Sequence, residues 1–123
     1  MTKKKTSKAE EELLEALKSK DVYVRLAAAR YRHATPEVLL TALKDKHEWV
    51  RSKAAYNRKA TPEVLLRAME DKDYYVRCKA ALNPNATPEV LLVALKDKDE
   101  NIRRSAAKHP NATPRSASRC PQR

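Results

Sequence analysis

The stretch Ala34-Thr35-Pro36-Glu37-Val38-Leu39-Leu40 occurs three times in this chain of 123 residues. It returns unchanged at residues 60–66 and 86–92, which sets a repeat period of 26 residues. The three units that begin with it match one another at 16 of 26 positions in every pair. A fixed period of this length indicates stacked supersecondary units, each too small to bury its apolar face alone.

A more divergent unit precedes these three, and a further one begins after them and breaks off. We therefore expect a basic flexible tail at residues 1–8, an array of repeats at 9–111, and a truncated fifth repeat with a basic tail at 112–123. The four repeats of the array are 8–33, 34–59, 60–85 and 86–111.

Each unit contains signals for two short helices. Thr35 suits the N-cap of the first helix, Pro36 suits its first position, and Glu37 complements the positive end of the helix. Its apolar face is expected to consist of Leu39, Leu40, Ala42 and Leu43.

The second helix is expected to start at Asp45, which forms a capping box with Glu48; Asp97 and Glu100 repeat this pair. Its buried face is expected to consist of Val50, Ala54 and Ala55. In the third unit Asn83 marks the end, where asparagine can take the left-handed position usually given to glycine.

The composition agrees with helices throughout, because the chain has no Gly and no Phe and is rich in Ala, Leu, Lys, Arg and Glu. We expect an all-α fold, a short right-handed α-solenoid of about four 26-residue helix–turn–helix repeats. No apolar run reaches the roughly 20 residues of a membrane span, and the charged N-terminus has no signal-peptide pattern, which favours the cytoplasm. Cys78 and Cys120 lie far apart without metal-ligand spacing, so we expect neither a metal site nor a cofactor.

The pattern Asp-x-x-Val-Arg-x-x-Ala-Ala-x-Asn-Pro-Asn-x-Thr-Pro-Glu-x-Leu-Leu, spread over residues 8–111, resembles the leucine-rich repeat variant, a HEAT-like solenoid family. The resemblance implies alternating longer α-helices and shorter, partly 3₁₀ helices. The period of 26 residues is slightly long for that family, and the cysteines with which some members bind an iron–sulfur centre are missing. Some HEAT-like solenoids are DNA glycosylases that use an aspartate beside aromatic residues, but nothing in this sequence singles out such an acid.

One basic position is the same in all four units, occupied by Arg25, Arg51, Arg77 and Arg103. These arginines are expected to form a structural ladder by pairing with aspartates of the same or the adjacent unit, namely Asp45, Asp71, Asp73, Asp97 and Asp99. The alternative is a row of guanidinium groups for phosphates or carboxylates. Identical residues in every unit favour the structural role.

Aromatic residues align on the second helices as Tyr23, Trp49 and Tyr75, beside a variable basic stripe. They could stack on bases or grip a peptide. The alternative is that each one seals the gap to the next unit. That alternative is favoured because the last unit has Asn101 at this position.

A second variable region is basic at one end of the array only. The segments 30–33 and 57–59 lead into the helix starts at Thr35 and Thr61, where free N–H groups could bind an anion. Cations at the preceding helix ends are also expected from the helix dipole alone. The residues expected to bind a partner are Arg30, Tyr31, Arg32, His33, Trp49, Lys53, Tyr56, Arg58 and Lys59.

These features predict a binding module rather than an enzyme, since the three histidines fall at different unit positions. The net charge is +11, but residues 9–111 hold 20 basic against 16 acidic groups, a net of +4. An acidic protein or peptide is therefore the expected partner, with nucleic acid as the alternative. We also expect Val90, Leu91 and Leu95 to lie near a weakly covered C-terminal end that can self-associate.

Overall fold

The computed structural model describes residues 6–112, and in that range it contains eight α-helices and no strand. The helices are α1 (Lys8–Ala16), α2 (Val22–Ala29), α3 (Pro36–Ala42), α4 (Glu48–Ala55), α5 (Pro62–Ala68), α6 (Tyr74–Leu82), α7 (Pro88–Ala94) and α8 (Glu100–Lys108). The all-α prediction is confirmed. Nearly all of the expected tails, with Cys120, lie outside the described residues.

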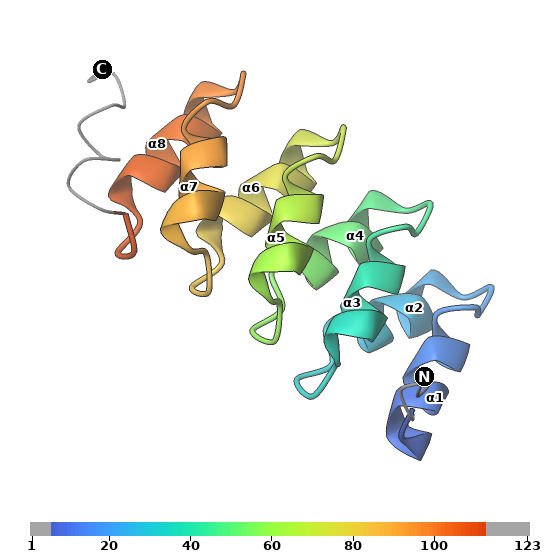
Figure 1. The fold of residues 1–123 in the computed structure, drawn as a ribbon. Helices are drawn as coiled ribbons and strands as arrows, with labels where there is room; N and C mark the ends of the chain where they lie inside the picture. Colours follow the sequence, from blue (N-terminus) through green and yellow to red (C-terminus); the bar gives the residue numbers. More distant parts are fainter. Residues whose placement is uncertain (1–5, 113–123) are drawn as a thin grey trace, which may run out of the picture.

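The helices lie in two rows (Figure 1). The first helices of the units (α1, α3, α5, α7) form one row and the second helices (α2, α4, α6, α8) form the other, and neighbours within each row are in contact. The loops inside the units (17–21, 43–47, 69–73 and 95–99), which we term the within-unit loops, lie along one edge. The loops after the second helices (30–35, 56–61, 83–87 and 109–112), the return loops, lie along the opposite edge.

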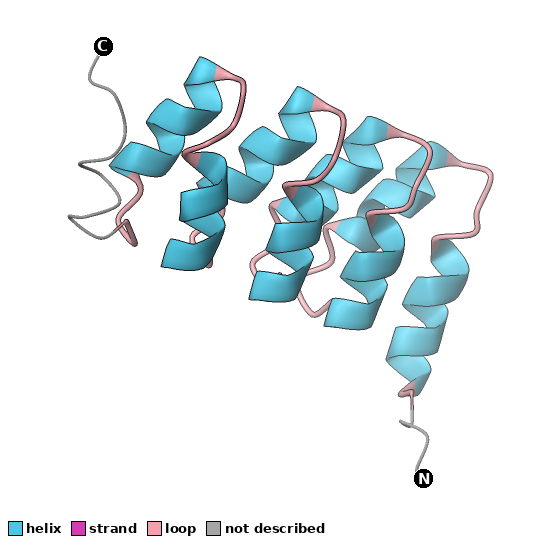
Figure 2. Ribbon diagram, turned by 45° about the horizontal axis from the view of Figure 1, so that its top comes forward, coloured by secondary structure: helices cyan, strands magenta, loops and turns pink. Residues whose placement is uncertain are grey.

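The core runs between the two rows and is built from the same positions in each unit. Val38 and Leu39 on α3 are fully buried, as are Ala54 and Ala55 on α4. Small alanines let the second helices approach one another closely, because they add no bulk at the contact. Figure 2 shows helices joined by loops along the described chain. All the helices between residues 6 and 112 are α-helices, so the 3₁₀ helices implied by the family resemblance are not seen there.

The first helices begin as expected. Thr35 is the N-cap of α3, its hydroxyl accepts the N–H of Val38 at 3.3 Å, and Pro36 occupies the first position. Thr61 and Thr87 cap α5 and α7 in the same way.

The second helices begin later than expected, so the prediction that Asp45 and Asp97 form capping boxes is wrong. Helix α4 begins at Glu48 with His47 as its N-cap, and α8 begins at Glu100 with Asp99 as its N-cap. Asp45 instead accepts the N–H of His47 at 2.9 Å and holds the within-unit loop.

The other carboxylate oxygen of Asp45 accepts a hydrogen bond from Arg25 in the preceding unit, and this contact repeats along the array as the arginine ladder. Its three ion pairs are Arg25–Asp45 at 2.9 Å, Arg51–Asp71 at 2.8 Å and Arg77–Asp97 at 2.8 Å. Each of these guanidinium groups also donates to one or two backbone carbonyls of its own within-unit loop. In the first unit Ser19 replaces the aspartate and still caps the loop. Asp73 and Asp99 are not in the ladder, because they cap helices.

A second ladder, which the sequence analysis missed, runs along the return loops. Asn83 is fully buried, and its amide N–H₂ donates to the carbonyls of Ala55 and Asn57 in the preceding unit, both at 2.9 Å. Its backbone has φ −62° and ψ 130°, so the expected left-handed conformation is wrong. Asn57 makes the same bonds to residues 29 and 31, and His109 replaces asparagine in the last unit.

The C-terminal end of the array also differs from expectation. Val90, Leu91 and Leu95 are buried, so the prediction that they lie near a weakly covered end is wrong. The exposed apolar residues of α7 are Leu92 and Val93, which lie on its other face. At the N-terminal end Glu11, Glu12 and Glu15 are exposed, whereas Glu10 is buried and accepts a hydrogen bond from the hydroxyl of Thr35.

Candidate binding surface

The return-loop edge of the first two units carries an open pocket of about 320 Å³. We term it the basic pocket; it is lined by Arg30, Arg32, Lys53, Tyr56, Asn57 and Arg58. Five of these six residues were expected to bind a partner, and the structure brings them together from α4 and the two return loops. Asn57 is the addition, and it is buried because it belongs to the asparagine ladder.

The four cations of the basic pocket are not neutralised by any described residue of the protein. Within residues 6–112, the side chains of Arg30, Arg32, Lys53 and Arg58 make no ion pair or hydrogen bond, whereas three of the ladder arginines each bind an aspartate. The sequence contains no acidic residue between Asp21 and Glu37 or between Glu48 and Glu63. Positive charge therefore accumulates at the return-loop edge of the first two units, whereas acidic and basic residues alternate in the within-unit loops.

The helix-dipole explanation of these cations receives little support from the geometry. Cations at a helix C-terminus stabilise the helix best when they lie against its last carbonyls. Here the carbonyls at the ends of α2 and α4 already accept hydrogen bonds from Asn57 and Asn83. Because the asparagine ladder satisfies these carbonyls, the neighbouring arginine side chains are left available to a ligand.

Tyr56 lines the basic pocket and also contacts a lysine of α6. The ammonium group of Lys79 lies 4.9 Å from the centre of the Tyr56 ring and 5.1 Å from that of Tyr75, within the range of cation–π attraction. Lys79 and Tyr75 are contributed by α6, and neither was among the expected partner-binding residues. Their alignment with Lys53 and Trp49 one unit earlier was the available signal.

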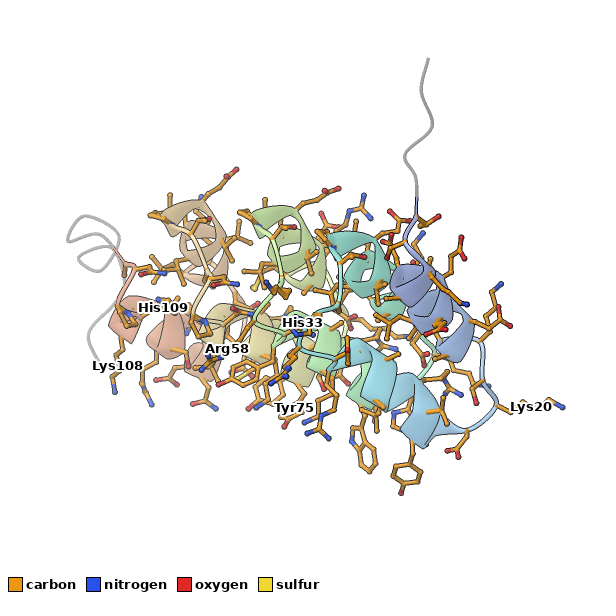
Figure 3. All side chains as sticks on the ribbon, turned by 90° about the horizontal axis from the view of Figure 1, so that it is seen from below. Lys20, His33, Arg58, Tyr75, Lys108 and His109 are labelled. Atoms are coloured by element: carbon orange, nitrogen blue, oxygen red, sulfur yellow. The ribbon has the colours of Figure 1, made fainter. Side chains whose placement is uncertain are left out.

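The aromatic residues of the second helices lie on the surface. The exposed fraction is 70% for Tyr23, 49% for Trp49 and 42% for Tyr75, so they do not seal the gaps between units as the favoured alternative required. Trp49 lies against His47 with ring centres 5.0 Å apart. The labelled Tyr75 and Lys108 side chains lie on the same side of the ribbon (Figure 3).

The remaining expected residues surround the pocket without lining it. Tyr31 and His33 are exposed and make an edge-to-face contact at 5.8 Å, and Lys59 is exposed on the second return loop. Figure 3 shows His33 and Arg58 far from Lys20, which lies in a within-unit loop. The anion site expected at the helix starts has few donors left, because Thr35 and Thr61 accept one N–H each and proline follows both.

The return loops have no arginine or lysine after the second unit. The positions of Arg32 and Arg58 are occupied by Pro84 and Pro110 in the later return loops. Next to these prolines, Asn111 donates to the backbone carbonyls of Pro84 and Ala86, so its amide ties loop to loop.

The described part of the chain offers little support for a metal site or a reactive thiol. Among residues 6–112, no three His, Cys, Asp or Glu side chains are grouped as a metal ion would require. Burial raises the pKa of the Cys78 thiol, although the charge of Lys79 opposes this, so the reactive thiolate is disfavoured. None of the helices between residues 6 and 112 is long and apolar enough to cross a membrane.

No protein-family model matches this chain, and no curated protein sequence matches it significantly. The relation to the leucine-rich repeat variant therefore stays a prediction from the repeat pattern.

Proposed function

We propose that this chain is a non-enzymatic binding module, a short right-handed α-solenoid of the HEAT-like class, which binds an acidic protein or peptide along its return-loop edge. The observation that carries the proposal is the basic pocket, where four cations share one open cavity of about 320 Å³ without an anionic partner among the described residues. Like charges held together repel one another, so a ligand that supplies negative charge gains from relieving this repulsion.

The rest of the surface supports a peptide-like ligand. Exposed aromatic rings beside cations offer large contact areas with a low entropy cost on binding, as is common where proteins bind proteins. Trp49 lies on α4, the helix that also carries the pocket residue Lys53, and Tyr56 directly follows the end of this helix. An acidic segment with apolar side chains can use both kinds of contact.

Nucleic acid is the second candidate, favoured by one observation. The exposed rings of Tyr23, Trp49 and Tyr75 occur once in each of the first three units, and such a row can stack on successive bases.

Binding titrations over a range of salt concentrations test the proposal. The ligands are a labelled Glu- and Asp-rich peptide with aromatic residues, random duplex DNA, and single-stranded DNA and RNA. The first variant replaces Arg32, Arg58 and Lys59 by Ala. The matched control replaces three exposed cations of the last unit, Lys96, Lys98 and Lys108, and so removes the same charge elsewhere.

We expect the peptide to bind and the first variant alone to weaken it, with little loss of stability because exposed charges contribute little to folding. Tighter binding of nucleic acid than of peptide, with a steep log-linear fall in affinity as salt rises, would establish the second candidate instead. Equal weakening by both variants would mean that only net charge matters and that the basic pocket is not a site.

A further inference from the structure

We propose that the basic pocket binds a phosphorylated side chain on the acidic partner. This inference rests on the proposed function and names the group that the pocket recognises. It follows from the number and type of the cations, from the size of the pocket, and from the way in which its aromatic wall is held.

The charge and the geometry of the cations suit a phosphate better than a carboxylate. A carboxylate has one negative charge and two oxygens, whereas a phosphorylated side chain has a charge of about −1.5 to −2 and three strong acceptor oxygens. Three arginines, Arg30, Arg32 and Arg58, line one pocket together with Lys53. Guanidinium forks bind phosphate oxygens in a bidentate manner, and several of them can share one phosphate.

The cations are contributed by structural elements that the protein fixes independently of any ligand. Arg30 and Arg32 lie in the first return loop, and Arg58 lies in the second. Asn57 joins the two loops by donating to Tyr31 O at 3.0 Å, and its own side-chain oxygen accepts the N–H of Lys59 at 2.8 Å. The backbones that carry the arginines are therefore held in place, which lowers the entropy cost of binding.

The pocket has room for one phosphorylated side chain. About 320 Å³ lies at the lower end of the range for ligand pockets. The Tyr56 ring, held by Lys79 at 4.9 Å, gives the carbon atoms next to the phosphate an apolar wall.

The distribution of charge along the array favours a phosphopeptide over nucleic acid. Strong nucleic-acid binding needs many phosphate contacts along an extended track. Here four cations that have no ion pair among the described residues line one pocket, and the later return loops have Pro84 and Pro110 at the positions of Arg32 and Arg58. One phosphate within an acidic segment fits this arrangement.

The experiment compares three labelled peptides that differ at one position of an acidic sequence, namely phosphoserine, glutamate or serine. Fluorescence anisotropy of the full chain measures the affinity of each peptide, with inorganic phosphate and random single-stranded DNA as competitors. The variants are Arg58→Ala and Arg58→Lys. Arg67→Ala is the matched control, because Arg67 is an exposed arginine on α5, away from the pocket. Circular dichroism establishes that each variant is folded.

We expect the phosphoserine peptide to bind about tenfold more tightly than the glutamate peptide, because it makes additional charge-assisted bonds. Both Arg58 variants should remove most of this preference. Arg58→Lys keeps the charge, but an ammonium group cannot make the bidentate hydrogen bonds of a guanidinium group. The control Arg67→Ala should leave the preference unchanged. Inorganic phosphate should compete with the phosphoserine peptide, because both would occupy the basic pocket.

Equal affinities for the phosphoserine and glutamate peptides would overturn the inference and leave the proposed function standing. If none of the three peptides binds, the proposed function fails as well. Single-stranded DNA that binds more tightly than the phosphopeptide and depends on Arg58 would also overturn the inference, since the phosphate would then belong to nucleic acid.

Discussion

The replacement Asn83→Ala tests whether the asparagine ladder holds the units together. Asn83 is 0% exposed, and its side chain makes three hydrogen bonds: to Ala55 O and Asn57 O at 2.9 Å each, and from the N–H of Asn85 at 2.8 Å. Alanine cannot make any of them. It therefore leaves two carbonyls and one N–H without these partners at the contact between the second and third units.

The expected cost follows from those three groups. Each unpaired buried polar group costs about 1–3 kcal/mol, and some carbonyls will regain a partner when water enters the space that the side chain leaves. We therefore expect Asn83→Ala to lower the free energy of unfolding by about 3 kcal/mol. For a domain of this size that corresponds to a fall of roughly 10–20 °C in the melting temperature.

Urea denaturation followed by circular dichroism measures this loss, and the fluorescence of Trp49 reports on the second unit separately. The control is Asn85→Ala, which removes an exposed amide that donates to Arg58 O and to Ala60 O. It should cost only about 0.5–1 kcal/mol, because water can replace its bonds. A loss below about 1 kcal/mol for Asn83→Ala, or equal losses for the two variants, would refute a stabilising role for the ladder.

Three further results are expected. Arg77→Ala should lower the free energy of unfolding, measured by urea denaturation, by about 2–4 kcal/mol, because it leaves the buried Asp97 without its ion-pair partner. The control Arg104→Ala breaks an exposed ion pair and should change this free energy by less than about 0.5 kcal/mol. Similar losses for the two variants would contradict a stabilising role of the arginine ladder. His109→Asn should keep or raise the melting temperature measured by circular dichroism, because the amide can donate to two carbonyls where the imidazole contacts one; a clear fall would show that the ring is needed for packing. If the exposed Leu92 and Val93 mediate self-association, sedimentation should show oligomers that dissociate when both are replaced by Lys, whereas a monomeric parent chain would contradict this.

The sequence by itself determined the features that depend on short-range chemistry and on repetition. Threonine followed by proline defines the starts of the first helices, because both residues act within one turn of the chain. The 26-residue period identified the units, and the unchanged arginine indicated a ladder, because a contact between identical units must use the same residues each time. The segments 30–33 and 57–59 were also recognised as a basic region from sequence alone.

Only the tertiary structure decided features that depend on what the neighbouring unit presents. Asp45 has the spacing of a helix cap, but it binds Arg25 from the unit before it, and the helix starts later. Asn83 has the sequence of a helix stop, but its amide reaches carbonyls 26 and 28 residues away.

The tertiary structure also decided which of the basic and aromatic residues share a site. The pocket forms because stacking two units places Arg30 and Arg32 of one return loop beside Lys53 and Arg58 of the next unit. The same stacking brings Lys79 of the third unit against Tyr56 of the second. A linear pattern shows which residue types recur, but the distance between side chains of different units depends on how the units pack.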